Sequence, residues 1–293
     1  MDIPFEHLRT LAAAVDAGTL DRAAARLGIT PSAVSQRIRV IEQRVGRVVL
    51  RRTKPVTATE AGEPLVRLAR QLDLLEHDAR AALGDDAGSA VVPLAVNADS
   101  LITWFLPALT AVTAAHPVTF DLHREDQERT AQLLAAGTVM AAVTSQRDAV
   151  AGCVSSPLGR MRYTAIATRG FADRWFPQGL GRAALEAAPR VDFDRHDTLQ
   201  SAFARRHGAR RDAPRHIISA SAEFAQAITI GLGWGMLLPG QFEAGVADGS
   251  LVILADDTVE VPLFWQRWNL SSPLLETVTT AVREAAERSP AVG

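Results

Sequence analysis

Apolar residues near the N-terminus recur at helical spacing in three consecutive segments. The first two segments end at Gly18 and Gly28, because glycine adopts the positive φ that terminates a helix at little cost. Thr30 provides an N-cap hydroxyl for the third, and Pro31 suits its first helical position. The pattern therefore predicts helices over residues 5–17, 20–27 and 31–45.

The third predicted helix has one apolar and one polar face. Its apolar stripe consists of Val34, Ile38, Ile41 and Val45. The other face carries hydroxyl, amide and guanidinium groups, which hydrogen-bond base edges and phosphates. Two helices joined by so short a turn match the helix-turn-helix motif, whose second helix enters the major groove of DNA. The predicted contacts to double-stranded DNA from this motif are Thr30, Ser32, Ser35, Gln36, Arg37 and Arg39.

The charge distribution supports this interpretation. Residues 22–54 contain nine Lys or Arg and one acid, a net charge of +8, whereas the whole chain carries −2, so the rest carries −10. A basic patch of this kind is typical of phosphate binding. Two short strands, 48–50 and 56–58, flank a basic tip that forms a wing. Its predicted phosphate contacts are Arg51, Arg52 and Lys54.

A long helix is predicted from Thr59 to about Leu83, followed by a hinge rich in Gly, Asp and Ser. Its narrow leucine seam favours pairing with a second copy of the chain. The alternative is that the helix packs on its own domain. The residues assigned to the dimer are Leu65, Leu68, Leu72 and Leu75.

From residue 91 onward the pattern alternates between strands and helices, which predicts an α/β architecture with a parallel sheet and helices on both faces. The predicted strands are 92–96, 118–124, 140–144, 163–168, 190–194, 217–219, 235–238, 251–253 and 261–268. The predicted helices are 101–115, 127–136, 182–187, 199–206, 221–231 and 273–287.

The composition limits the function classes. A single cysteine, Cys153, leaves no disulfide framework or cysteine metal cluster. No apolar run reaches membrane-spanning length without Pro or Gly, and the N-terminus lacks a signal-peptide pattern, so a cytoplasmic protein without membrane contact is expected. Hydrolase and dinucleotide-binding motifs are absent, and GLGWG at 231–235 lacks the Rossmann spacing. The sequence thus predicts no enzyme, cofactor or metal site.

The segment RAAARLGITPSAVSQRIRVIEQRVGRVVLRRT resembles the N-terminal signature of LysR-type transcriptional regulators. The resemblance implies a winged helix-turn-helix domain over residues 1–58, a linker and dimerisation helix over 59–84 and a hinge over 85–90. It also implies a periplasmic-binding-protein-like effector domain over 91–293. Lobe I of that domain would comprise 91–165 and 265–293, and lobe II 166–264. The expected partners are DNA, RNA polymerase and further copies of the chain, as a homodimer or a dimer of dimers.

A strand, a polar loop and a helix meet in AVNADSLITWFLPAL, residues 95–109, where an open α/β sheet binds ligands. Ser100 is expected to cap that helix and to bind a ligand carboxylate, while Asp99 suits an ammonium group. The alternative is that both residues only cap the helix, and that the other acids are first-turn residues. The candidate effector residues are Asn97, Asp99, Ser100, Glu125, Asp126, Thr144, Asp194 and Glu223, with Asp197 as a weaker candidate.

The segments NADSLITWFLPAL, REDQERT and SAEFAQA narrow the resemblance to the ArgP/LysG (IciA) branch. That resemblance implies that lysine or arginine is the effector and that an amino-acid exporter gene is the target. The carboxylates fit a cationic amino acid, bound between the predicted lobes. Two alternatives stay open: a LysR-type regulator with another effector, and an amino-acid-binding protein without a role in transcription.

Overall fold

The computed structural model describes the chain except for Met1, Asp86, Ala87, Glu125 and Asp126 and the side chains of Gln127 and Glu128. The described chain divides into two compact units. The first comprises Met1–Asn97, Leu109–Ser156 and Trp265–Ala281, and the second Ala98–Ala108, Pro157–Phe264 and Val282–Gly293. These units are not the domains expected above, whose boundaries stay a prediction.

The N-terminal part of the first unit is a winged helix-turn-helix domain. Its elements are α1 (Phe5–Ala17), α2 (Leu20–Leu27), α3 (Pro31–Val45), β1 (Leu50–Arg51) and β2 (Thr57–Ala58). The Thr30 hydroxyl accepts a hydrogen bond from the amide of Ala33 at 3.2 Å, and Gly18 and Gly28 adopt left-handed conformations. The buried side chains of Ile38 and Ile41 complete the core. The three predicted helices and their terminal signals are confirmed.

The long helix α4 (Glu63–Ala82) begins four residues later than predicted. Thr59 caps a separate turn, in which its hydroxyl donates to the carbonyl of Val48 at 2.7 Å and accepts from the amide of Gly62 at 3.1 Å. A Cβ atom at Gly62 would lie 1.9 Å from the carbonyl oxygen of Val49. The chain therefore requires glycine at position 62 to pass the wing before α4 begins.

The rest of the first unit contains parallel strands, as the alternating pattern predicted. Strand β3 pairs in parallel with both β4 and β5. The elements here are β3 (Ala90–Val96), α6 (Leu106–Ala115), β4 (Val118–Arg124), α7 (Gln127–Ala135), β5 (Ala141–Thr144) and α13 (Pro273–Arg288), although α6 and α13 each extend into the second unit.

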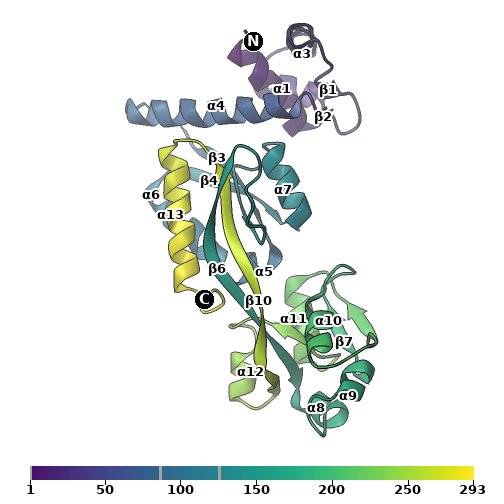
Figure 1. Cartoon of the computed structure of the whole chain (residues 1–293). Coiled ribbons are helices and arrows are strands. Elements are labelled where there is room, and N and C mark those ends of the chain that lie inside the picture. Colours follow the sequence, from purple (N-terminus) through teal and green to yellow (C-terminus); the bar gives the residue numbers. More distant parts are fainter. Residues whose placement is uncertain (1, 86–87, 125–126) are drawn as a thin grey trace. The chain divides into compact units, whose positions relative to one another are not determined.

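Two long strands, β6 (Cys153–Thr168) and β10 (Leu251–Trp268), lie beside each other and run from one unit into the other (Figure 1). The hydrogen-bonded strand order is β4-β3-β5-β10-β6-β9. Strand β9 (Gly235–Leu237) is antiparallel to β6, so the sheet is mixed. The predicted parallel pairing is confirmed for β3 with β4 and β5 and is wrong for β6 with β9. The predicted strands 251–253 and 261–268 form one strand, because pairing with a long neighbour carries β10 through a polar stretch.

The helix after β3 begins earlier than predicted. It comprises α5 (Ala98–Ser100), a π-helical turn (Leu101–Phe105) and α6. Ser100 lies inside the helix and makes no capping hydrogen bond, so the predicted cap is wrong. The π turn precedes Pro107, which lacks an N–H for the helical hydrogen-bond ladder. By length and composition alone, Ala98–Ala115 is the one helix among the described residues that is apolar enough for a membrane span.

The second unit has its own core around Ile166, Val191, Ile228 and Leu237. The parallel strands β7 and β8 form a small sheet. The predicted cap of α11 by Ser221 is wrong: Ser221 is the first residue of the helix, and the N-cap is Ala220, which makes no side-chain hydrogen bond. The elements are α8 (Arg169–Trp175), α9 (Arg182–Ala187), β7 (Arg190–Asp192), α10 (Leu199–Arg206), β8 (Arg215–Ile217), α11 (Ser221–Thr229) and α12 (Glu243–Ala247). The short helices α8 and α12 were not predicted.

Candidate DNA interface and effector site

The polar face of α3 is available for DNA contact. Thr30, Ser32, Gln36 and Arg39 are exposed, and Ser35 is half-buried. The opposite face is held in the core by Val34 and Ile38. The Thr30 and Ser32 hydroxyl groups lie 2.9 Å apart, which places both at the N-terminus of the helix. The face that the sequence assigns to the major groove is therefore the solvent-facing one.

Arg37 differs from Arg39 in its environment. The Arg37 guanidinium donates to the hydroxyl of Thr10 on α1 at 3.1 Å and lies 4.0 Å from the carboxylate of Glu6. Arg39 is exposed, and within the described part of the chain it has no hydrogen-bond or ion-pair partner. The geometry favours Arg37 as the residue that positions α3 on α1, while DNA contact by either residue stays a prediction.

Replacing Arg39 with alanine is expected to weaken binding to a duplex selected in vitro from random sequence by about 1–3 kcal/mol, if the guanidinium reads a guanine. Binding to unselected DNA should fall less. Gel shifts on both duplexes measure the difference. An Arg39→Ala protein that binds both duplexes as well as the original chain would contradict the assigned orientation of α3.

The wing presents its basic residues to solvent. Arg51, Arg52 and Lys54 are all exposed beside the two-stranded β1–β2 ribbon. The Thr53 hydroxyl donates to the carbonyl of Pro55 at 2.6 Å and closes the tip. Such a tip brings cations to the DNA backbone without bringing hydrogen-bonding groups to base edges.

Arg52→Ala should therefore weaken binding by a similar factor on all DNA sequences. It should also reduce the slope of log affinity against log salt concentration by about one unit for the lost phosphate contact. Fluorescence anisotropy over a salt series provides this slope. If the slope stays the same, Arg52 does not contact phosphate.

The predicted dimer seam on α4 is only partly available to a second chain. Leu65 is 5% exposed and belongs to the core of its own winged-helix domain, and Leu72 packs against the same core. Leu68 is 36% exposed, and Leu75 is half-buried. Leu65 thus packs on its own domain, which was the alternative considered for this seam. Leu68 is the most exposed of the four leucines and the best candidate for a dimer contact.

The substitution Leu68→Asp should dissociate the dimer that the seam predicts, because a buried unpaired carboxylate is costly. Gln71→Asp adds the same charge to a neighbouring position of α4 and serves as the control. Light scattering gives the oligomeric state of both proteins. A Leu68→Asp protein with the mass of the original oligomer would exclude Leu68 from the interface.

Within the second unit, two carboxylates and a phenol form an acidic cluster, in which Asp99 is hydrogen-bonded to Tyr163 and Asp197 acts on Asp99 through its charge. The Asp197 carboxylate itself accepts backbone hydrogen bonds from Phe193 at 2.9 Å and Leu199 at 3.0 Å. The Tyr163 hydroxyl donates to the Asp99 carboxylate at 2.7 Å. Burial raises the pKa of Asp99, and the nearby carboxylate of Asp197 raises it further, against the effect of the Tyr163 hydrogen bond. The pKa of Tyr163 is well above its usual value, because the phenol is buried beside these acids. An incoming cation would relieve the repulsion between the two carboxylates.

The other candidates of the second unit have different surroundings. Asp194 accepts backbone hydrogen bonds from His196 at 2.6 Å and Asp197 at 2.8 Å, which is the role of a turn-forming aspartate. Glu223 is exposed and has no partner among the described residues. Ser100 is fully buried, and its hydroxyl lies 3.8 Å from the sulfur of Met161. Effector contact by these three side chains stays a prediction.

Two described candidate residues belong to the first unit. Thr144 is buried at the end of β5, and its hydroxyl accepts from the amide of Gln146 at 3.1 Å. The side-chain oxygen of Asn97 is buried without a hydrogen-bond partner in the described structure, as expected of an atom that awaits a ligand. Glu125 and Asp126 lie outside the described residues.

Tyr163 was not among the predicted effector residues. It is the only tyrosine of the chain and lies 64 residues from Asp99, so no local pattern links the two. One indication that Tyr163 is functional was present in the sequence: it lies in a predicted strand whose other residues are small or apolar. A buried phenol requires a hydrogen-bond partner. The partner that the fold provides, Asp99, was already a predicted effector residue.

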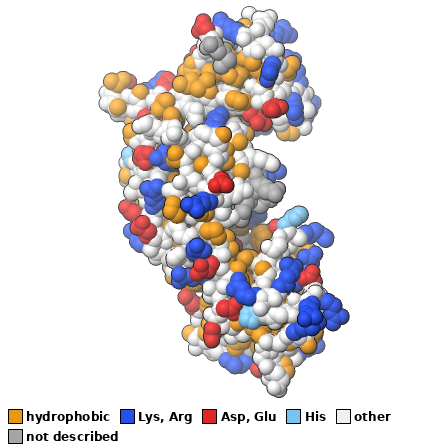
Figure 2. All heavy atoms as spheres, in the orientation of Figure 1, with side chains coloured by type: hydrophobic (Ala, Val, Ile, Leu, Met, Phe, Trp, Pro, Cys, Tyr) orange, Lys and Arg blue, Asp and Glu red, His pale blue; other side chains and the backbone are white. Residues whose placement is uncertain are grey.

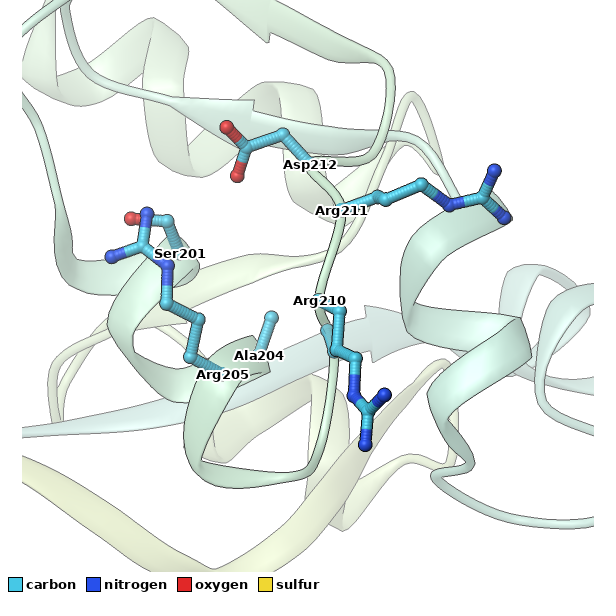
Figure 3. A pocket seen from close by; sticks show the side chains of 7 residues that line it. Ser201, Ala204, Arg205, Arg210, Arg211 and Asp212 are labelled. Carbon is cyan, nitrogen blue, oxygen red and sulfur yellow. The ribbon is translucent and has the colours of Figure 1, made fainter.

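A small pocket of about 100 Å³ on α10 and the loop after it is a poor site for a basic amino acid. Its rim carries Arg205, Arg210 and Arg211, whose guanidinium groups point in different directions (Figure 3). Figure 2 shows basic side chains gathered over this part of the second unit. These cations repel a cationic ligand, whereas the Asp99 cluster attracts one.

Comparison with known proteins establishes the class of this protein. Residues 5–63 match the family described as bacterial regulatory helix-turn-helix protein, lysR family, and residues 88–287 match the LysR substrate binding domain. The chain belongs to the LysR family of transcriptional regulators, which is not a family of enzymes.

Its relatives place it in the LysG and ArgP branch of that family. The lysine export transcriptional regulatory protein LysG of Corynebacterium efficiens is 40% identical over 96% of this chain and 97% of its own length. The crystal structure of ArgP from Mycobacterium tuberculosis is 43% identical with a TM-score of 0.88, over 96% and 97% of the two chains. Full-length LysG from Corynebacterium glutamicum with bound effector Arg is 38% identical with a TM-score of 0.81, over 98% and 99%.

Proposed function

We propose that this chain is a DNA-binding transcriptional regulator that responds to lysine or arginine and controls a gene for amino-acid export. The observation that carries the choice of effector is the cluster of Asp99, Tyr163 and Asp197. Two carboxylates in a partly buried setting bind a cationic group, and each charge-assisted hydrogen bond contributes about 1.5–3 kcal/mol.

Two relatives support the same assignment. The Corynebacterium glutamicum LysG structure contains the effector Arg, and the Corynebacterium efficiens relative is named for lysine export. Within the second unit, the proposed contacts are those of the cationic groups of the effector with Asp99 and Asp197. Asn97 and Thr144 are candidates for its other polar groups on the evidence of the sequence. Glu223, Glu125 and Asp126 are further candidates for a cationic group, and Ser100 for the carboxylate.

The proposed partners follow from the same assignment. The helix-turn-helix domain binds double-stranded operator DNA, and RNA polymerase is the machinery that such a regulator recruits or blocks. A two-fold operator requires at least a homodimer, which places two copies of α3 on successive major grooves. We also propose that the protein acts in the cytoplasm, where its DNA target lies.

Calorimetry with free amino acids tests the choice of effector. Lysine or arginine should bind, whereas leucine and glutamate should not, because their side chains leave the carboxylates unpaired. The affinity for histidine shows how strongly binding depends on the position of the side-chain charge. Tight binding of an aromatic or dicarboxylic acid in place of both basic amino acids would leave a LysR-type regulator with another effector. Binding of lysine without any affinity for DNA would favour an amino-acid-binding protein.

A further inference from the structure

Two arginines of α4 connect the helix to loops of the β3–β4–β5 region in the same compact unit. Arg67 donates to the carbonyl of Ala151 at 2.7 Å, and its second terminal nitrogen lies 3.7 Å from the sulfur of Cys153. Arg70 donates to the carbonyl of Gly137 at 2.7 Å and also pairs with Asp16 at the end of α1. Arg70 therefore contacts the winged-helix domain and the sheet region at once.

Two glycines make this close approach possible. A Cβ atom at Gly137 would lie 2.6 Å from Cβ of Arg67, and one at Gly152 would lie 2.6 Å from a terminal nitrogen of Arg67. Both glycines also have positive φ, of 69° and 75°. The loops are thus shaped to receive Arg67, and any larger residue at either position would displace it.

The loop that receives Arg67 begins at a candidate effector residue. The Thr144 hydroxyl accepts from the amide of Gln146, the first step of segment 145–152. The buried side chain of Gln266 then holds this segment at three points: it donates to the carbonyls of Gln146 and Asp148 at 3.0 and 2.9 Å and accepts from the amide of Val150 at 3.0 Å. The next carbonyl, that of Ala151, accepts from Arg67.

Beside these contacts the interface is open. A groove of about 730 Å³ separates α1 and α4 from the strands, and its lining includes Arg9, Asp73, His77, Asp121 and His123. Side chains that line an open polar groove can rearrange without creating a buried void. The orientation of α4 on the sheet therefore depends on a few directional bonds, among which those of Arg67 and Arg70 are central.

We propose that segment 145–152 reports effector occupancy to the DNA-binding domain through Arg67. This inference rests on the proposed function, since it takes Thr144 as an effector contact. A ligand at Thr144 favours one arrangement of the segment, and that arrangement decides whether the Ala151 carbonyl meets Arg67. Helix α4 packs on α1 and Arg70 pairs with Asp16, so a change at Arg67 moves the helices that bind DNA. The coupling equals the difference in effector affinity between the two arrangements.

The variant Arg67→Met tests the inference, because it keeps the length of the side chain and removes its hydrogen-bond donors. Arg80→Met, on the exposed end of α4, is the matched control. The measured quantity is the ratio of DNA affinities with and without saturating arginine, on a duplex selected in vitro from random sequence. We expect this ratio to approach one for Arg67→Met and to stay as in the original chain for Arg80→Met, with arginine affinity changed less than about twofold in both.

Hydrogen exchange without any amino acid provides a second readout. Segment 145–152 should exchange faster in Arg67→Met than in Arg80→Met, because it has lost the anchor at Ala151. Three results would each overturn the inference: equal exchange in the two variants, an unchanged affinity ratio in Arg67→Met, or a ratio of one in the original chain when calorimetry shows that arginine is bound. A failure of the proposed function has a different signature, namely that calorimetry detects neither lysine nor arginine binding while the exchange difference is present.

Discussion

Replacing Asp99 with asparagine should weaken the binding of arginine by about 10- to 100-fold, the loss expected for one charge-assisted hydrogen bond. The side chain keeps its shape and an oxygen that can accept from Tyr163, while the negative charge disappears. Calorimetry measures the affinity. Asp173→Asn, an exposed position of the same unit, removes an equal charge and should leave the affinity unchanged.

The pH dependence of the same pair of proteins gives an independent check. A cationic effector binds the ionised carboxylate, so its affinity falls as the pH drops through the pKa of Asp99 in the free protein. Because burial raises that pKa, the loss begins at a higher pH than an ordinary aspartate would give. Asp99→Asn should lose this component. An unchanged affinity and an unchanged pH profile in Asp99→Asn would show that the effector does not meet this carboxylate.

In the absence of arginine, Asp99→Asn should not lose stability, although it loses affinity for arginine. A carboxylate whose pKa is raised on folding destabilises the folded state once the pH is above that pKa. At neutral pH, Asp99→Asn should therefore melt at the same or a higher temperature than the original chain in the absence of arginine. A loss of binding with retained stability separates a ligand contact from a residue that only supports the fold.

The N-terminal helices were predictable because their signals are local. Thr30 caps the helix that follows within three residues, and Gly18 and Gly28 end helices where the apolar period stops. The late start of α4 was not predictable from the same rules. It depends on the carbonyl of Val49, which approaches Gly62 from the wing.

The effector-binding half depends more on contacts between distant residues. Strand β10 continues through polar residues because it pairs with β6, which is itself a long strand, and no local sequence pattern indicates a partner so far away in the chain. The candidate acids show the same limit. Asp194 and Asp197 are three residues apart and chemically identical, and both accept backbone hydrogen bonds, yet of the two only Asp197 contributes to the raised pKa of Asp99. The sequence was enough to select the acidic residues as candidates for a cationic effector, but the surroundings of each one are known only from the fold.

Gly62→Ala should destabilise the winged-helix domain by about 3 kcal/mol or more, because its Cβ atom meets backbone that cannot move independently. The added atom would lie 1.9 Å from the carbonyl oxygen of Val49 and 2.9 Å from its carbon. Either the wing or the first turn of α4 must shift, and both support α3. Circular dichroism should show a lower melting temperature for part of the helical signal, and DNA binding should fall with it.

Substitutions at two other glycines serve as controls, because they add the same methyl group without a steric clash. Gly46 has a φ of 70° and open space around it, so Gly46→Ala should cost only about 1 kcal/mol of backbone strain. Gly170 lies in a helix without a positive φ and without a close neighbour, so Gly170→Ala should be neutral or slightly stabilising. Three of the five tryptophans, Trp104, Trp175 and Trp234, belong to the second unit, so most of the tryptophan fluorescence monitors that unit and its melting should change little in Gly62→Ala. A Gly62→Ala protein no less stable than Gly46→Ala would show that the wing yields to the added methyl group at little cost.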